Sequence, residues 1–394
     1  MAKDKFFILV DQAIEYLLYA MIFFMPIAKA SIAIIFGFIF LLFIIKKFLR
    51  PDFEFLRNAP HLFLLLFFVF SAISLLNSGQ LIHKSLAALF GKWLMRIIIF
   101  VIIEDTLNTP KRLRRAVLVL ATIAFLVSID AVFQQFTGKD FFHGRLLVDR
   151  HPTAGFENQN SLGAYLAPIF IFLIPLSFAR MLKQKYKYSI IILSLLAAVA
   201  LFLTFSRSAW LTVLFGLFVF LFLSLGIRKA LVAVLICIIV FISVPQISNR
   251  FVRGDYKDRF SLMETSFAMI KDKPFLGLGL GTYMDHFEDY ATIKGVYYAH
   301  NSYLQIWAES GIFSLLSILM FVGALLHGSI ILLRKNRDYL LLGLVCSAGA
   351  LLFHAFFEVH LYSLQLATFF WFMLGLLSAS TRTLSKNESG TCLI

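Results

Sequence analysis

Long apolar runs separated by short charged segments make up most of this sequence. An α-helix of about 20 apolar residues crosses the roughly 30 Å hydrocarbon layer of a bilayer. Hydrophobic residues are 60% of the 394-residue chain and charged residues 15%, whereas soluble domains carry about 45–50% and about 25%. The sequence therefore predicts an all-α polytopic membrane protein and excludes soluble globular, disordered and disulfide-stabilised proteins.

Charged and turn residues divide these runs into about twelve predicted transmembrane helices, within a single integral-membrane domain of residues 1–394. The first run is expected to be a retained span and not a signal peptide, because no small-residue cleavage site precedes a soluble domain. The predicted limits are 12–28, 31–45, 60–77, 87–103, 116–136, 161–179, 188–205, 208–226, 229–245, 304–333, 338–356 and 363–380.

The basic residues set the expected orientation. With the N-terminus in the cytoplasm, every short inner loop carries Lys or Arg, as cytoplasmic loops usually do. Both termini are then cytoplasmic, and the net charge of +14 favours contact with anionic lipid and not with nucleic acid. None of the three cysteines falls in a predicted outer segment, so neither a disulfide nor a thiolate metal site is expected.

Two outer segments, 137–160 and 246–303, hold most of the remaining charges. The second is the only long hydrophilic insertion, and such insertions usually carry function. Within it, residues 258–270 place apolar side chains on one helical face, which predicts an amphipathic helix along the membrane surface. The glycines that follow at 277–281 have the spacing of a phosphate loop, but no strand precedes them, so a tight turn is favoured.

Two residues of the outer side are the main candidates for chemistry. His300 lies where the large loop enters the tenth span, and it can serve as a catalytic base or simply cap backbone groups at the interface. Arg207 lies in a very short outer turn, where a cation at the edge of an apolar bundle costs free energy unless it reaches lipid phosphates or an anionic substrate. The residues alone leave both alternatives open.

Weaker candidates lie elsewhere. His354, Glu358 and His360 share an outer turn, and the first two have the spacing of a zinc pair, although a metal site needs three or four ligands. Asp130, with Gln134 and Gln135, forms a polar patch near the outer end of the fifth span that is also consistent with helix–helix contact.

The motifs of the C-terminal half resemble those of the O-antigen ligase and polymerase superfamily of bacterial inner membranes. The likeness covers roughly residues 145–360, and the sequence departs from the family at Met263, where tryptophan is common, and at Ser314, where Gly, Thr or Tyr is usual. Four motifs occur in order: the asparagine-containing segment 155–163, the Ser-Arg turn 204–209, Asp258–Arg259 with 273–279, and His300–Asn301 with Gly311.

This resemblance implies a GT-C-like architecture with its active site at the periplasmic loop 246–303. Family members transfer a glycan from undecaprenyl pyrophosphate to an acceptor hydroxyl, without a nucleotide sugar, a metal or another cofactor. Such a reaction needs fixed cations for the pyrophosphate, a base for the hydroxyl and a lipid-open groove for the polyprenyl tail. The arginine fork and the histidine imidazole suit the first two needs.

We therefore expect Arg207 and Arg259 to bind the pyrophosphate and His300 to activate the acceptor hydroxyl for inverting attack. A lipid A–core sugar is the favoured acceptor, which makes the chain a ligase. Further substrate contacts are expected from Arg145, Arg150, Asn158, Asn160, Arg253 and Asn301.

Three other functions remain open. A polymerase of the same superfamily would use a second lipid-linked glycan as acceptor, and a protein O-glycan ligase would use a protein hydroxyl. A secondary transporter also suits twelve spans, and Lys92 and Arg96 within the fourth span are its best support. Transporters, however, place their ionisable residues near the midplane, often in repeated halves, and here most lie at the outer rim.

Overall fold

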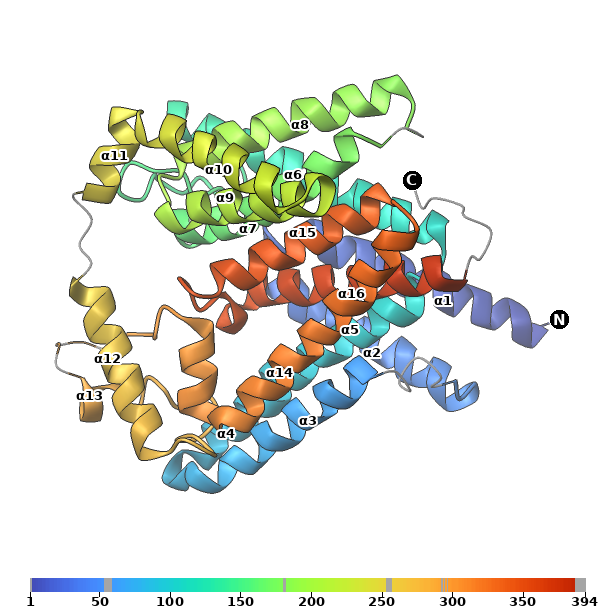
Figure 1. Ribbon diagram of the computed structural model, residues 1–394. Helices are drawn as coiled ribbons and strands as arrows, with labels where there is room; N and C mark the ends of the chain where they lie inside the picture. The colour runs from blue at the N-terminus through green and yellow to red at the C-terminus, as the bar shows by residue number, and fades with distance from the viewer. Residues whose placement is uncertain are drawn as a thin grey trace.

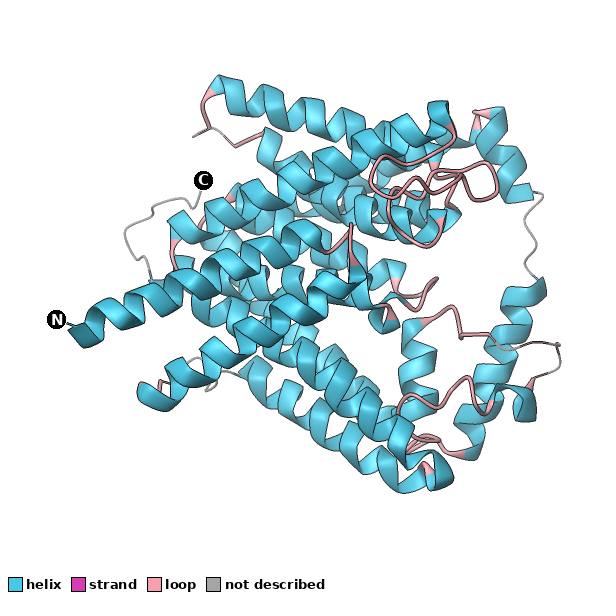
Figure 2. Ribbon diagram, turned by 180° about the vertical axis from the view of Figure 1, so that it is seen from behind, coloured by secondary structure: helices cyan, strands magenta, loops and turns pink. Residues whose placement is uncertain are grey.

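The computed structural model describes residues 2–52, 59–179, 182–252, 257–291, 293, 295 and 297–386. These ranges are almost entirely helical (Figure 2), and their only β-type pairings are two isolated bridges, Lys139–Leu146 and Val148–His151. The expected all-α fold is confirmed for this part of the chain.

The helices of the first half alternate in direction along the bundle (Figure 1). In chain order they are α1 (Ala2–Phe24), α2 (Lys29–Leu49), α3 (Ala59–Ile73), η2 (Ser74–Asn77), η3 (Gly79–Leu81), α4 (Ile82–Ala88), the π-helical η4 (Leu89–Leu94), α5 (Met95–Thr106), α6 (Pro110–Thr137) and α7 (Gln159–Ser177).

The described residues of the second half form seven helices of 16 residues or more and three short ones. They are α8 (Gln184–Leu203), α9 (Arg207–Leu225), α10 (Ile227–Ile242), α11 (Pro245–Val252), α12 (Lys257–Asp272), α13 (Phe287–Tyr290), α14 (Ser302–Lys335), α15 (Tyr339–His354), η5 (His360–Tyr362) and α16 (Leu364–Lys386).

Every predicted span overlaps one of these helices or a run of adjoining ones. Among the described residues, ten helical stretches are long and apolar enough to cross a membrane. The pair α10 and α11 also qualifies as a unit but bends by 89°, and α15 is apolar but shorter. The polytopic character is therefore confirmed, whereas the count of twelve spans stays a prediction.

The bundle has two distinct ends. The start of α1 and the end of α16 lie at one end, and α11, α12 and α13 lie at the other (Figure 1). We name the latter the loop end. The turns α1–α2, α6–α7, α8–α9 and α15–α16 also lie there, so every candidate site residue that the structure describes belongs to the same end.

The centre of the bundle is formed by α16 and α7, whose side chains are mostly buried. Helix α16 packs against α5 and α15, and α7 packs against α8, α9 and α15. Small residues allow these close approaches, as is common in membrane bundles. A Cβ at Gly343 of α15 would lie 2.7 Å from the carbonyl oxygen of Phe172 in α7.

A sharp kink divides α14. Gly311 has φ +80° and ψ 173°, so the helix breaks there and resumes at Ile312. The segment 274–279 fills the break: Ile312 N donates to Pro274 O at 3.0 Å, and Gly279 N donates to Glu309 O at 2.9 Å. A Cβ at Gly311 would lie 1.9 Å from Phe275 O, so only glycine fits. Residues 274–279 thus form a backbone wedge between the two parts of α14, a contact that the sequence did not predict.

Helix α12 crosses the loop end at a steep angle to the spans (Figure 1). Leu262, Ser266 and Met269 are buried against the rest of the loop, and Ser266 shares a hydrogen bond with Tyr283. Phe260 and Phe267 of the predicted apolar stripe are exposed. The expected amphipathic helix is therefore present with its aromatic side chains turned away from the protein; its contact with the membrane surface stays a prediction.

Candidate functional site

A polar pocket of about 430 Å³ lies at the loop end. It collects residues from the α1–α2 turn, the start of α7, the segment before α14 and the α15–α16 turn. Its lining consists of Lys29, Glu157, Asn158, Asn160, Ser161, Ala164, Tyr298, His300, Glu358, Val359, His360, Tyr362, Ser363, Leu364 and Leu366.

Glu358 joins two of the expected catalytic residues. Its Oε2 lies 3.1 Å from His300 Nδ1, and its Oε1 lies 3.3 Å from Nη2 of Arg259. Nη1 of Arg259 also donates to the carbonyl oxygen of Phe357 at 3.0 Å. One carboxylate of the pocket therefore contacts both the imidazole, which also lines the pocket, and a guanidinium from the large loop, which does not.

The backbone around His300 is held firmly. His300 has φ +47°, a left-handed conformation that costs a non-glycine residue about 1 kcal/mol or more. The next turn is fixed from both sides, because Ser302 N donates to Ala355 O and Ser302 Oγ donates to Glu358 O, each at 2.8 Å. These bonds tie the start of α14 to the turn that carries Glu358, and a third of the His300 side chain (37%) stays accessible.

Three helix N-termini meet at the pocket, whose lining also holds Lys29, paired with Glu157, and the carboxylate of Glu358. Helices α7 and α16 begin in its wall at Asn158–Ser161 and at Ser363–Leu364, and α14 begins two residues after His300. Each helix N-terminus carries roughly half a positive charge, and the side chains of Asn158 and Asn301 already accept from amide groups of α7 and α14. Burial, with the nearby Glu309 and Glu157, raises the pKa of Tyr298, so its hydroxyl remains a hydrogen-bond donor.

Arg207 is half-buried at the first position of α9 and is not among the lining residues of the polar pocket. The preceding Ser206 and the following Ala209 pack on Gly163 of α7, where a Cβ would lie 2.8 Å from that of Ala209. Gly163 adjoins Ala164, which lines the pocket. The structure thus places Arg207 and His300 at the same end, and their meeting in one cavity stays a prediction.

The expected asparagines have structural roles in the structure as well. Asn158 caps α7 by accepting from Ser161 N at 2.8 Å, and Asn301 caps α14 by accepting from Tyr303 N at 3.0 Å. Asn158 and Asn160 line the polar pocket, whereas Asn301 lines a separate apolar one. Any contact of these side chains with substrate is untested.

The expected basic contacts are more dispersed. Arg145 is exposed and donates to Gly155 O at 3.1 Å, so it shapes the loop that leads to Asn158. Arg150 is exposed at the tip of the same loop, and Arg253 lies outside the described residues.

The polar patch of α6 holds this loop in place. Asp130 accepts from Phe141 N at 2.7 Å, and Gln134 accepts from Thr153 N at 2.8 Å and from Ala154 N at 2.9 Å. These side chains bind loop backbone and not another helix, which differs from the helix–helix contact that the sequence left open.

Glu358 is the functional candidate whose pairing the sequence did not identify. It stands 58 positions after His300, and the sequence suggested only a zinc interpretation for its turn. The structure separates that set: Glu358 faces His300, while the buried His354 and His360 approach each other with their Nδ1 atoms 3.5 Å apart. Among the described residues no three His, Cys, Asp or Glu side chains form a metal-binding group. Burial lowers the pKa of His360 to about 3, so this imidazole is neutral.

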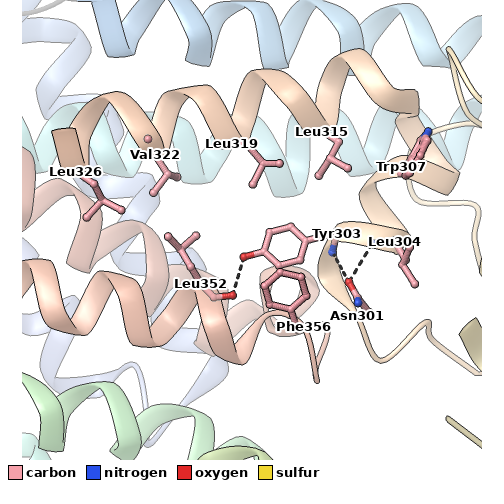
Figure 3. A pocket seen from close by; sticks show the side chains of 11 residues that line it. Asn301, Tyr303, Leu304, Trp307, Leu315, Leu319, Val322, Leu326, Leu352 and Phe356 are labelled. Atoms are coloured by element: carbon pink, nitrogen blue, oxygen red, sulfur yellow. Dashed lines mark hydrogen bonds between the residues drawn. The ribbon is translucent and has the colours of Figure 1, made fainter. Parts of the chain in front are cut away.

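An apolar pocket of about 510 Å³ opens on the other side of Asn301 (Figure 3). Leu315, Leu319 and Val322 of α14 face Leu352 of α15 and Phe356 of the turn after it. It is closed toward the loop end by the first turns of α14, where the Tyr303 hydroxyl donates to Leu352 O at 2.6 Å. The kink at Gly311 separates those first turns from the rest of α14. The pocket is therefore lined by both parts of this bent helix and by the end of α15.

Comparison with known proteins identifies the central part of the chain. Residues 192–319 match a family model described as O-antigen ligase. The central third of the chain is therefore similar to O-antigen ligases. This confirms the resemblance to the O-antigen ligase superfamily, and with the apolar helices it indicates a membrane protein of the glycosyltransferase or ligase type. A search of curated proteins finds no match to the chain.

The matched segment spans about a third of the chain, from α8 to the middle of α14. It contains Arg207, Arg259 and His300. Glu358 and the start of α7 lie outside the matched residues but complete the pocket in the folded chain.

Proposed function

We propose that the whole chain acts as one integral-membrane glycosyltransferase of the ligase type. It would move a glycan from undecaprenyl pyrophosphate to a sugar hydroxyl of lipid A–core, at the periplasmic face of the bacterial inner membrane. In this proposal the loop end is periplasmic and both termini are cytoplasmic. The core supports a single domain, since one cluster of buried apolar residues joins the spans α1 to α9 with α14, α15 and α16.

The contact of His300 with Glu358, beside Arg259, is the observation that carries the proposal. A carboxylate beside Nδ1 favours the tautomer with a proton on that atom, because Glu358 can only accept when ionised. Nε2 is then left as the proton acceptor. An imidazole oriented in this way is a usual general base for a hydroxyl near neutral pH.

The proposed reaction is a single displacement. Nε2 of His300 takes the proton of the acceptor hydroxyl while that oxygen attacks the anomeric carbon of the donor sugar. The bond from that carbon to the phosphate oxygen breaks on the opposite face, so the configuration inverts and undecaprenyl pyrophosphate leaves as an anion. Arg207, Arg259 and the helix N-termini stabilise its growing charge without a metal ion.

The remaining candidates fit around that step. We assign Asn158 and Asn160 to the donor headgroup because they line the pocket, and Arg145, Arg150 and Arg253 to the outer glycan. The apolar pocket beside Asn301 suits the first isoprene units of the lipid tail, since its lining is almost wholly hydrocarbon and it adjoins the segment that carries His300.

The test uses the purified full chain in detergent with an undecaprenyl-pyrophosphate-linked glycan and EDTA. His300→Ala should lose about 10²- to 10⁴-fold in rate, and Arg207→Ala about 10²- to 10³-fold. His83→Gln is the matched control, because His83 is exposed in α4 and lines neither pocket. Near wild-type transfer by both site variants would overturn the assignment.

The acceptor separates the members of the superfamily. Transfer to lipid A–core supports the ligase, extension of a second lipid-linked glycan supports the polymerase, and transfer to a protein hydroxyl supports the protein ligase. Substrate movement across proteoliposomes with no glycan transfer would instead support a transporter.

A further inference from the structure

Arg96 is a buried cation that the proposed reaction does not use. It lies in α5, just after the π-helical η4, and only 1% of it is exposed. A buried charge is costly unless it is well compensated, and inside a membrane protein such a residue usually has a function. Among the described residues its hydrogen-bond partners are carbonyl groups and not a carboxylate.

Three consecutive carbonyl groups surround this guanidinium. Nη1 donates to Leu361 O at 2.7 Å, and Nη2 donates to Ser363 O at 3.2 Å and Tyr362 O at 3.4 Å. The planar fork of arginine reaches all three, which the single ammonium group of lysine cannot match. Trp93 supports the arrangement, because its ring lies 5.8 Å from the guanidinium and edge-on to Tyr362.

The π-helical η4 explains how the side chains of Trp93 and Arg96 both reach the turn between α15 and α16. A π-turn inserts one extra residue into a helix and re-aims the side chains around it, and such turns are frequent at functional sites. Here η4 contains Trp93 and ends just before α5, so Trp93 and Arg96 both contact the turn between α15 and α16.

That turn is the back wall of the polar pocket. His360, Tyr362, Ser363 and Leu364 all line the pocket, and Glu358 precedes them in the same turn. The carbonyl groups of residues 361–363 in this turn accept from Arg96, so the guanidinium lies directly behind the pocket wall. Its charge is permanent, because arginine stays protonated in proteins.

We propose that Arg96 is a positioning residue for the glycan transfer inferred above, on which this inference rests. It fixes the turn that carries Glu358 and the start of α16, and it adds a positive charge behind the site that holds the pyrophosphate. No carboxylate among the described residues forms an ion pair with it, so its field acts on the pocket through low-dielectric protein and strengthens anion binding.

The two contributions can be separated by substitution. Arg96→Met removes charge and fork together, whereas Arg96→Lys keeps the charge and loses the fork. The control Lys92→Met removes a positive charge from η4, where the side chain is exposed. For each variant, kcat and KM for donor and acceptor and the inhibition constant of inorganic pyrophosphate are measured on the full chain in detergent, beside its melting temperature.

Arg96→Met should weaken pyrophosphate inhibition about tenfold and raise the donor KM similarly, while the acceptor KM changes less than about twofold. Arg96→Lys should keep pyrophosphate inhibition within about threefold of wild type but lower kcat about tenfold, because the turn with Glu358 is no longer fixed. Lys92→Met should match wild type. A uniform loss that follows the melting temperature would instead indicate a purely structural role and overturn the proposal.

Other outcomes are also decisive. If Arg96→Met folds and keeps the wild-type pyrophosphate inhibition constant and kcat, the inference is wrong. If Arg96→Met does not fold, a wild-type kcat in Arg96→Lys would also show that the inference is wrong. Absence of transfer by the wild-type chain with every pyrophosphate-linked donor would instead overturn the proposed function, so the two failures are distinguishable.

Discussion

Glu358 contacts both His300 and Arg259, with its two carboxylate oxygens 3.1 Å and 3.3 Å from their respective nitrogen atoms. The two partners come from different elements, since His300 precedes α14 and Arg259 lies in α12. The carboxylate therefore couples the orientation of the proposed base to the position of the large loop. An incoming pyrophosphate would compete with Glu358 for Arg259.

Replacing the carboxylate tests this coupling. Glu358→Gln keeps the shape of the side chain but cannot stabilise an imidazolium, so we expect kcat to fall about 10- to 100-fold with little change in melting temperature. Glycan transfer with saturating donor and acceptor measures the effect. Glu288→Gln, at an exposed position of α13, is the matched control. Unchanged kcat in Glu358→Gln would remove Glu358 from the mechanism.

Arginine geometry is tested by charge-conserving changes. Arg207→Lys and Arg259→Lys keep the positive charge but lose the two-pronged contact with phosphate oxygens. We expect each to retain most of the roughly 10²- to 10³-fold defect of the alanine variant. The measurement is kcat/KM for the lipid-linked donor. Full rescue by lysine would show that a point charge suffices, and the proposed bidentate contact would be wrong.

The capping asparagines allow structure and substrate binding to be separated. Asn158→Ala removes the N-cap of α7 and should cost about 1 kcal/mol of stability, whereas Asn158→Ser retains a capping oxygen. If Asn158 also contacts the donor, Asn158→Ser should keep the melting temperature but raise the donor KM. Thr109→Ser serves as the comparison, since Thr109 caps α6 by accepting from Arg112 N and lines neither pocket. Equal donor KM values in wild type and Asn158→Ser would limit Asn158 to capping.

The kink in α14 should not tolerate a side chain. Gly311→Ala would place a Cβ 1.9 Å from Phe275 O and hold a non-glycine residue at φ +80°. We expect a loss of at least about 2 kcal/mol in stability, seen as a lower melting temperature and poor yield of monodisperse protein. Gly323→Ala in the same helix is the control, because no atom lies within 4 Å of its Cβ position. Equal stability of the two variants would contradict the wedge.

The buried His360 should make the protein sensitive to acid. Burial lowers the pKa of His360 to about 3, below the ordinary value of about 6.5. Above pH 6.5 neither the folded nor the unfolded chain protonates it, so its full contribution is present; as the pH falls from about 6.5 toward 3, only the unfolded chain gains the proton and stability is lost. His360→Gln should flatten the fall in melting temperature between about pH 7 and pH 5, and His83→Gln should not. An unchanged slope in His360→Gln would contradict this origin.

The sequence predicts the helical elements well because membrane spans depend on local hydropathy. Each expected span overlaps a helix, and the limits differ mainly where a helix extends past the apolar run, as α6 does before residue 116. The kink at Gly311 was not predictable from local pattern, because it exists only through backbone contacts with residues 274–279. The same reason applies to η4, whose π-helical form has no hydropathy signature.

The site was predictable in part. His300 and Arg259 stood out through motifs, and the structure joins them through Glu358. Glu358 was overlooked as their partner because a contact between residues 58 apart depends on how α14 and α15 pack, and no spacing rule expresses that. Arg96 was noticed as an oddly placed charge, but the carbonyl groups it holds belong to a turn more than 260 positions later.

The backbone wedge at residues 274–279 limits how this protein can be re-engineered. Asn77 Nδ2 donates to Gly277 O at 2.7 Å, and a Cβ at Gly279 would lie 2.5 Å from Ser78 Oγ. A graft that exchanges the large loop between homologues, in order to change acceptor preference, would have to transplant residues 77–78 and the Gly311 break along with it. Chimeras cut only at the loop boundaries should misassemble even when both parents are stable.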